Sequence, residues 1–265
     1  MRVALGKLNM VWEEKEASFQ KAEKMIQEAA KKGCDIIIFP EMAFTGFSMN
    51  VSKIGENAKD ARTVSVMQIM AQKYQIAVGF GWAALGQENR KGTNRFTIID
   101  ASGKKVAEYS KLHSFTYGKE SVYYDKGSKI VTVPFLGRTI ATFICYDLRF
   151  PEIFQIAAKK ADVMFVIAEW PAKRRVHWQT LLRARAIETQ SYVVGVNCVG
   201  EHDGQTYSGD SMAVDAMGNI LGMISDKEGV LICDLDDRAW SLRRKFATAA
   251  DRREGFYQSY FDRKD

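Results

Sequence analysis

Three residues of types that can carry acyl-transfer chemistry each follow a predicted β-strand. Glu41 comes just after the apolar run 36–39, and Lys111 and Cys145 each come after a further predicted strand. A carboxylate base, a cation that stabilises a tetrahedral intermediate and a thiol nucleophile together suffice for acyl transfer. Because α/β proteins tend to place their sites at the carboxyl ends of strands, the pattern indicates a candidate active site.

Cys145 lies between a predicted strand and a helix that Pro151 is well placed to begin. A thiol on such a turn has backbone N–H groups nearby, an arrangement that favours the thiolate and can stabilise an oxyanion. The alternative is a buried structural cysteine, since cysteine is among the most buried residue types. Cys34, Cys198 and Cys233 lie within or beside apolar strands and are predicted to be structural.

Glu41 and Lys111 also have simpler interpretations, as a loop carboxylate or helix cap and as a solvated surface lysine. A nucleophilic thiol needs a base or a partner that lowers its pKa. The three histidines, His113, His177 and His202, do not indicate a Cys–His pair. The carboxylate at the strand end is therefore the better candidate base.

Alternating helices and strands must position these residues. Residues 14–32 have the periodicity of an amphipathic helix, and the continuous apolar run 36–39 suits a strand covered on both faces. Two hairpins are predicted, one around the turn 101–103 and one around 216–219. This mixture indicates an α/β fold with mixed sheets.

A helix–strand unit occurs twice along the chain. Residues 27–39 and 155–167 both have the pattern of a helix end, a short turn and a buried strand. The repetition indicates either two related halves that face each other across a core, or a pattern that helix-to-strand units share in general.

The composition is that of a globular protein with a sizeable core. The chain has 265 residues, of which 46% are hydrophobic and 26% charged. No apolar run is long enough to span a membrane and no signal-peptide pattern occurs, so we expect no membrane partner and a cytoplasmic location. The net charge of +6 comes from basic residues interspersed with acidic ones, which argues against nucleic acid as a partner. The cysteine spacings do not indicate a zinc site.

Three segments together resemble the nitrilase superfamily of carbon–nitrogen hydrolases. They are residues 39–42, 109–113 and 144–152, and the likeness extends from residue 2 to about 234. The resemblance implies a four-layer α-β-β-α sandwich of the nitrilase type, with two mixed sheets. It also implies a single domain over 1–265 with a C-terminal tail from about 235, a homodimer or larger homo-oligomer, and no metal or organic cofactor.

The same resemblance implies a Glu–Lys–Cys triad. Glu41 would be the general base, Lys111 would stabilise the tetrahedral intermediate, and Cys145 would be the nucleophile that forms a thioester. The backbone N–H of Tyr146 would complete the oxyanion site. Glu120 resembles a second glutamate of the family, which positions the lysine or the substrate.

Within the superfamily, residues 39–49 and 169–178 resemble the ω-amidase branch, which acts on the terminal amide of 2-oxoglutaramate or 2-oxosuccinamate. The carboxylate of such a substrate needs a cation, for which Arg174 is preferred over Arg175. The pocket walls that we expect are Phe44, Tyr146 and Trp170. Glu169 departs from the branch, where Asn is expected. A carboxylate there could repel an acidic substrate, or could hold Arg174 or Lys111.

The motifs leave other activities open. A general aliphatic amidase, an N-carbamoyl amino acid hydrolase and a nitrilase would use the same triad. A more remote alternative is a non-catalytic scaffold that keeps the fold for assembly, although packing alone does not require an acid, a cation and a thiol at three strand ends.

Overall fold

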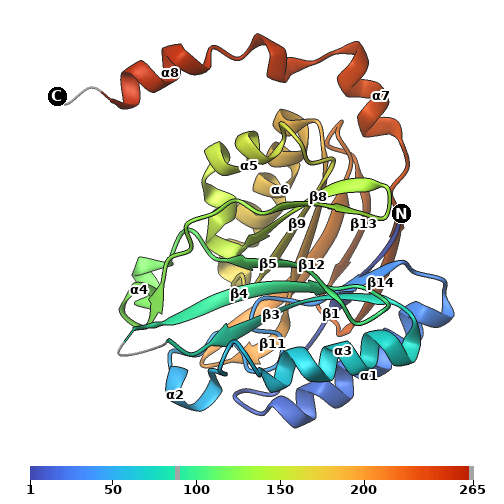
Figure 1. Cartoon of the computed structure of the whole chain (residues 1–265), viewed down its shortest axis with the longest axis vertical. Coiled ribbons are helices and arrows are strands. Elements are labelled where there is room, and N and C mark those ends of the chain that lie inside the picture. Colours follow the sequence, from blue (N-terminus) through green and yellow to red (C-terminus); the bar gives the residue numbers. More distant parts are fainter. Residues whose placement is uncertain (87–89, 263–265) are drawn as a thin grey trace.

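One mixed sheet is built mainly from the N-terminal half of the chain in the computed structural model, which describes residues 1–86 and 90–262 (Figure 1). Its central strand is Ile-Ile-Ile, fully buried on both faces, as expected of β-branched residues in a parallel strand. Over the described residues the sheet has seven strands in the order β14-β1-β2-β3-β4-β5, with β6 beside β4. Their bounds are β14 Gly229–Asp234, β1 Arg2–Lys7, β2 Ile36–Ile38, β3 Ala77–Ala84, β4 Gly92–Ile99, β5 Lys105–Ser110 and β6 Tyr124–Asp125.

The second mixed sheet comes from the C-terminal half. It also has seven strands in the described part of the chain, ordered β11-β12-β10-β9-β8-β7 with β13 beside β12. The three central strands, β8 to β10, pair in parallel. The bounds are β7 Thr132–Phe135, β8 Arg138–Ile144, β9 Val163–Ala168, β10 Tyr192–Asn197, β11 Val199–His202, β12 Gln205–Val214 and β13 Ile220–Ser225.

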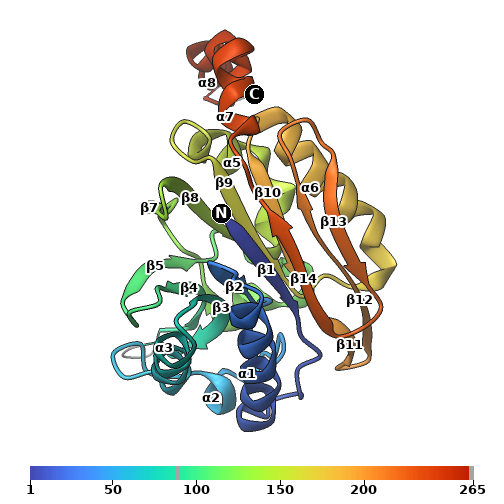
Figure 2. The ribbon, with the colours of Figure 1, turned by 90° about the vertical axis from the view of Figure 1, so that its right-hand side faces the viewer.

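Helices cover the outer face of each sheet, which completes four layers (Figure 2). Helices α1 (Lys15–Lys31) and α3 (Arg62–Tyr74) pack on the first sheet, and α5 (Pro151–Ala157) and α6 (Arg175–Thr189) pack on the second. The predicted α-β-β-α sandwich with two mixed sheets is therefore confirmed. The repeated helix–strand units correspond to α1–β2 and α5–β9, which occupy matching places in the two sheets.

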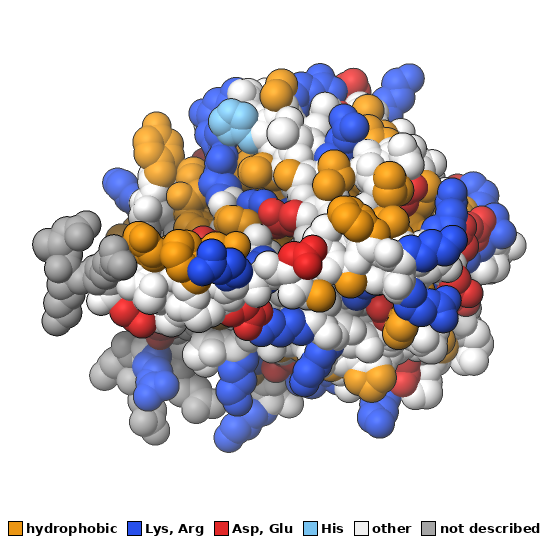
Figure 3. All heavy atoms as spheres, turned by 90° about the horizontal axis from the view of Figure 1, so that it is seen from above, with side chains coloured by type: hydrophobic (Ala, Val, Ile, Leu, Met, Phe, Trp, Pro, Cys, Tyr) orange, Lys and Arg blue, Asp and Glu red, His pale blue; other side chains and the backbone are white. Residues whose placement is uncertain are grey.

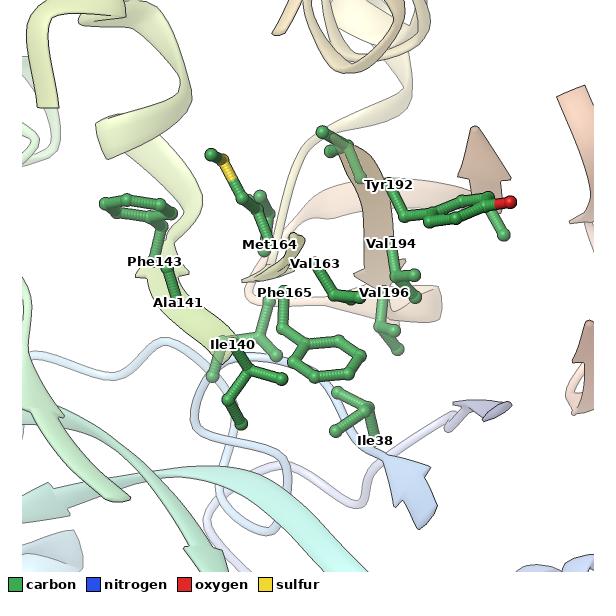
Figure 4. Packing of buried hydrophobic residues seen from close by; sticks show 14 of the residues in the cluster. Ile38, Ile140, Ala141, Phe143, Val163, Met164, Phe165, Tyr192, Val194 and Val196 are labelled. Carbon is green, nitrogen blue, oxygen red and sulfur yellow. The ribbon is translucent and has the colours of Figure 1, made fainter. Parts of the chain in front are cut away.

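The core between the sheets is made of apolar side chains from both of them. Figure 4 shows Ile38 of β2 near Phe165 of β9 and Val196 of β10, all fully buried in one cluster. A second cluster fills the space between the first sheet and its helices. Burial of this apolar surface, worth about 25 cal/mol per Å², holds the carboxyl ends of strands from both sheets at one edge of the sandwich.

Two segments differ from what their sequence patterns predict. The apolar run 192–199 predicts one strand, but the chain forms two, divided after Asn197, whose side chain accepts hydrogen bonds from the backbone N–H groups of Trp170 and Cys198. The pattern before the 216–219 turn predicts a strand from residue 211, but β12 already begins at Gln205. The 101–103 turn does join β4 to β5.

Short helices and a C-terminal segment complete the fold. Helices α2 (Val51–Ile54) and α4 (Glu120–Tyr123) lie in loops, and after β14 the chain continues through α7 (Arg238–Lys245) to α8 (Glu254–Phe261). In Figure 1 this last segment extends beyond the sandwich. None of the helices within 1–86 and 90–262 is both long and apolar enough to cross a bilayer. On the face in Figure 3, basic side chains are interspersed with acidic and apolar ones.

Candidate active site

The structure brings the four predicted catalytic side chains together. Glu41 follows β2, Lys111 follows β5, Cys145 follows β8, and Glu120 begins α4. The ammonium group of Lys111 lies 2.8 Å from Oε1 of Glu41 and 3.0 Å from Oε2 of Glu120. The lysine and both acids are almost completely buried. Lys111 is therefore no solvated surface lysine, and Glu41 is no exposed loop carboxylate.

Asn94 of β4 completes this polar cluster. Its Nδ2 donates to Oε1 of Glu41 at 2.7 Å and to Oε1 of Glu120 at 3.0 Å. The sequence analysis did not identify this residue. A signal was present, because Asn94 lies two and four residues before Phe96 and Ile98 and so shares their buried face of the strand. A polar side chain on a buried face needs a hydrogen-bond partner.

The ion pairs decide the protonation state of Lys111. Burial tends to lower the pKa of its ammonium group, but the charges of Glu120 and Glu41 outweigh burial and raise that pKa well above its ordinary value. The lysine is thus held as a cation between two carboxyl groups. It is suited to electrostatic stabilisation of an oxyanion, and not to proton abstraction at neutral pH.

Cys145 differs from the expectation of a stabilised thiolate. Desolvation, the negative charge of Glu41 and a hydrogen bond to it raise the pKa of the thiol well above its ordinary value, although Lys111 acts in the opposite direction. The resting group is therefore a thiol, and it needs a base in contact with it. The residue has φ of 47°, in the left-handed region, where the turn Cys145–Arg149 leaves the sheet.

Asp147 connects the cysteine turn to the lysine segment. Its Oδ2 accepts hydrogen bonds from Tyr109 Oη at 2.7 Å and from the Ile144 backbone N–H at 3.1 Å. Its Oδ1 accepts one from the backbone N–H of His113 at 2.9 Å. Tyr109 and His113 flank Lys111, so one fully buried carboxylate ties together the segments that carry the cation and the thiol.

A cavity of about 580 Å³ opens beside these groups. This volume suits a small organic ligand. Of the predicted walls, Tyr146 and Trp170 line it, and Arg174 lies on it as expected. Further lining comes from residues that the sequence analysis did not single out, including Trp12, Glu13, Phe47, Met49, Phe115, Arg149, Lys173, Asp203 and Tyr207.

The prediction that Phe44 walls the pocket was wrong. Phe44 is 1% exposed and packs under α1, with its ring centroid 4.8 Å from that of Phe19. The chain turns at Gly46, which has φ of 80°, and Phe47 faces the cavity instead. A single sequence does not reveal which aromatic residue of this loop points inward.

Three cations on the cavity, Arg149, Lys173 and Arg174, form no ion pair with a carboxylate within the described residues. Arg174 lies over the ring of Phe115 at 5.5 Å, and Arg149 lies over the ring of Trp170 at 4.8 Å. Arg175, the other candidate, is not on the cavity and forms an ion pair with Asp210 at 2.6 Å. Of the two adjacent arginines, only Arg174 is therefore placed to contact a ligand in the cavity.

The described residues contain no group of three or more His, Cys, Asp or Glu side chains arranged to hold a metal ion. Cys34, Cys198 and Cys233 are buried and unpaired, in line with a structural role.

Comparison with known proteins places this site in a family context. The sequence profile described as carbon–nitrogen hydrolase matches residues 2–244. The chain is 32% identical over 244 residues to 2-oxoglutaramate amidase of Bacillus subtilis (strain 168), covering 91% of this chain and 93% of that protein. It is 34% identical over 222 residues to omega-amidase YafV of Escherichia coli (strain K12), covering 83% and 84%.

Solved structures have the same fold. XC1258 from Xanthomonas campestris, a CN-hydrolase superfamily protein with an arsenic adduct in its active site, has a TM-score of 0.88 and 27% identity, with 95% of this chain and 97% of that chain covered. The amidase from Nesterenkonia sp. AN1 has a TM-score of 0.89 at 20% identity, with 98% and 99% covered. At that identity the second likeness concerns the fold alone.

Proposed function

Because the chain belongs to the carbon–nitrogen hydrolase family, we propose that it is an amidase that hydrolyses the terminal amide of a 2-oxo dicarboxylic acid, such as 2-oxoglutaramate or 2-oxosuccinamate, and releases ammonia. One observation carries the mechanism: a buried lysine lies between two carboxyl groups, beside a thiol, on a cavity of about 580 Å³. The two amidases named above support the substrate class.

In the first half-reaction, Glu41 removes the proton of the Cys145 thiol as the sulfur attacks the amide carbonyl carbon. The ammonium group of Lys111 and the backbone N–H of Tyr146 stabilise the oxyanion that forms. The C–N bond then breaks as the proton held by Glu41 passes to the nitrogen. Ammonia leaves and a thioester to Cys145 remains.

In the second half-reaction, Glu41 removes a proton from water, which attacks the thioester carbonyl. The carboxylic acid product forms and the thiol of Cys145 is restored, so that amide and water give acid and ammonia. Glu120 and Asn94 act as positioning residues: both bond to the Glu41–Lys111 pair and fix its geometry. Cation and base are thereby in place before substrate arrives.

Arg174 is proposed to bind the substrate carboxylate at the cavity wall, with Tyr146 and Trp170 as neighbouring walls. Arginine is suited to this role because its guanidinium group can bind a carboxylate through two hydrogen bonds. Replacement of Arg174 by Met should raise KM for an acid-bearing amide by about tenfold or more and leave a neutral amide unaffected. Arg175→Met is the matched control, since Arg175 is paired with Asp210 away from the cavity.

Ammonia release by the purified protein tests the proposal. The substrates are 2-oxoglutaramate and 2-oxosuccinamate, with glutamine, an aliphatic amide, an N-carbamoyl amino acid and a nitrile for comparison. We expect preference for the oxo-acid amides. Preference for one of the other compounds would assign the same mechanism to that class and refute the proposed substrate.

Variants of the three reacting groups test the mechanism. Cys145→Ala should abolish turnover, and Glu41→Gln and Lys111→Ala should each lower kcat by about a thousandfold or more. Mass spectrometry of the wild-type enzyme, quenched with acid during turnover, should detect the acyl group on Cys145. Near-normal turnover by Glu41→Gln would contradict the assigned base.

We also propose that the protein works as a homodimer or larger homo-oligomer in the cytoplasm. Support for self-association comes from apolar side chains on the outer helices of the second sheet, where Ile156, Val176 and Ile187 are each more than half exposed. The cytoplasmic location stays a prediction, which cell fractionation would check.

A further inference from the structure

Glu169 is a buried acid at the active site that the proposed mechanism does not use. It follows β9 directly and is 4% exposed. Its backbone N–H donates to Oε2 of Glu41 at 3.0 Å, and its backbone oxygen accepts from Sγ of Cys145 at 3.9 Å. The residue also lines the cavity. Its side chain therefore begins between the proposed base and nucleophile.

Neither carboxyl oxygen of Glu169 has a hydrogen bond of good geometry within the described part of the chain, and the backbone N–H of Phe47 is only a weak donor toward it. The other two acids of the site differ in this respect. Glu41 accepts from Lys111, Asn94 and the Glu169 backbone, and Glu120 accepts from Lys111, Asn94 and the backbone N–H of Phe115. The sequence-based suggestion that Glu169 holds Lys111 or Arg174 was therefore wrong.

A carboxylate in such surroundings would be very costly, because a buried charge needs a counter-charge or hydrogen-bond donors. Burial and the negative charge of Glu41 raise the pKa of Glu169 well above its ordinary value, and the Phe47 backbone N–H and Lys111 oppose them without offsetting them. The remaining titratable groups that it faces are the thiols of Cys145 and Cys198 and the Tyr207 hydroxyl. None of the three is a cation that could stabilise an ionised Glu169.

We propose that Glu169 remains protonated in the working enzyme and determines specificity, because as a neutral acid it lets the pocket accept amides that carry a carboxylate. The inference rests on the proposed function, since it concerns which amides enter the site. An ionised Glu169 would place a second negative charge beside Glu41 and repel such a substrate. A neutral one adds no such repulsion to the attraction of Arg174.

Infrared spectroscopy tests the protonation state without reference to activity. The difference spectrum between the wild type and Glu169→Gln at pH 7 should contain the carbonyl stretch of a protonated carboxylic acid, with the expected shift in deuterium oxide. Glu169→Met, a neutral side chain of similar length, provides a second difference spectrum if the Gln variant does not fold. Carboxylate stretches in place of the acid band would overturn the proposal.

A ratio of specificities tests the consequence for substrates. The quantity is kcat/KM for 2-oxoglutaramate divided by kcat/KM for a neutral aliphatic amide at pH 7. An effect of the substitution on the reacting groups is common to both substrates and cancels in this ratio. Glu169→Gln should keep it within about threefold of the wild type, because one neutral hydrogen-bonding group replaces another. A rise of about tenfold or more would mean that wild-type Glu169 is charged.

The two tests separate this inference from the proposed function. If no amide is hydrolysed, the proposed function fails, while the infrared band still decides whether Glu169 is protonated. If 2-oxoglutaramate is hydrolysed but the band is absent, the proposed function stands and the inference fails.

Discussion

Cys145, the proposed nucleophile, has a strained backbone conformation. A residue with a Cβ atom at φ of 47° adopts a conformation that glycine tolerates far better. Strain of this kind costs on the order of 1–3 kcal/mol and persists at functional sites because the surrounding structure imposes it. The backbone conformation of Cys145, which places the thiol beside Glu41, therefore lowers the stability of the protein.

A comparison of two inactive variants tests this strain. Cys145→Gly should have a larger free energy of unfolding than Cys145→Ala, by about 1 kcal/mol, although it has fewer atoms to pack. Urea unfolding followed by circular dichroism measures both. The control is Ala22→Gly in the middle of α1, where the order should reverse because the backbone is helical. A Gly variant at 145 that is less stable than the Ala variant would exclude the strain.

At the same scale, the sequence allowed some site residues to be predicted and not others. Glu41, Lys111 and Cys145 could be predicted because each follows a strand, and strand ends meet at one edge of a sheet. Asn94 and Arg149 were missed because their roles depend on contacts between distant segments. Phe44 was misplaced because the loop after β2 reverses at Gly46, and loop conformation depends on tertiary packing.

At the scale of elements, the end of β5 and the turn after β8 belong to different sheets and meet through Asp147. We expect Asp147→Asn to lower kcat by about a hundredfold, since a shift of about 1 Å in a reacting group has an effect of this size. KM should change little, because Asp147 is not on the cavity. Initial rates of ammonia release over a range of 2-oxoglutaramate concentrations provide kcat and KM.

Tyr109→Phe is the matched variant for this prediction. It removes one of the hydrogen bonds to Asp147 and leaves those from Ile144 and His113, so its loss in kcat should be clearly smaller. Equal losses of kcat in the two variants would show that the Asp147 carboxylate does not position the two segments through its combined hydrogen bonds.

Strand β1 carries an unusual buried cation at its end. Lys7 is 0% exposed, and its ammonium nitrogen has no hydrogen-bond partner within the described residues. Burial lowers its pKa from 10.5 to about 8, against the opposing attraction of Asp226 and Asp210. The folded state therefore releases this proton more readily than the unfolded state does.

The sign of the effect on stability follows from linkage. Below about pH 8 the amine is protonated in both the folded and the unfolded state, so the cost of burying its charge is fully present. Between about pH 8 and 10.5 the amine is neutral in the folded state only, and the folded state gains stability as pH rises. Lys7→Met should thus raise the free energy of unfolding at pH 7 by roughly 2 kcal/mol, and less at pH 10. Denaturant titrations at the two pH values measure this, with exposed Lys24→Met as control. A gain that is the same at both pH values would contradict the shifted pKa.

At the scale of the whole molecule, the two outer layers differ in the apolar surface that they expose. A solution dimer through the second sheet's helices predicts that Ile156→Glu combined with Ile187→Glu yields a monomer. Sedimentation velocity would measure the mass. Ile69→Glu is the matched control, because Ile69 is 63% exposed on α3 of the opposite layer. A monomeric wild type, or dissociation by the control alone, would contradict this interface.

The four-layer architecture could be predicted from the family resemblance, whereas the alternation of buried strands with amphipathic helices indicated only an α/β fold with mixed sheets. Strand β7 was not predicted, because Pro134 lies within the short segment Thr132–Phe135 and weakens its strand signal. The split between β10 and β11 depends on the contacts of Asn197 with Trp170. Such features arise from long-range contacts, which local patterns do not encode.

The pairing of β1 with β14 has a consequence for biosynthesis. Residues 2–7 pair with β2 on one side, but their partner on the other side is residues 229–234. One edge of the first sheet therefore stays open while the ribosome makes almost all of the chain. The acid and the cation emerge with the first sheet, and the thiol comes later from the second. A nascent chain should therefore acquire amidase activity in one late step, after residue 234 has left the exit tunnel, and fragments released before that step should be inert.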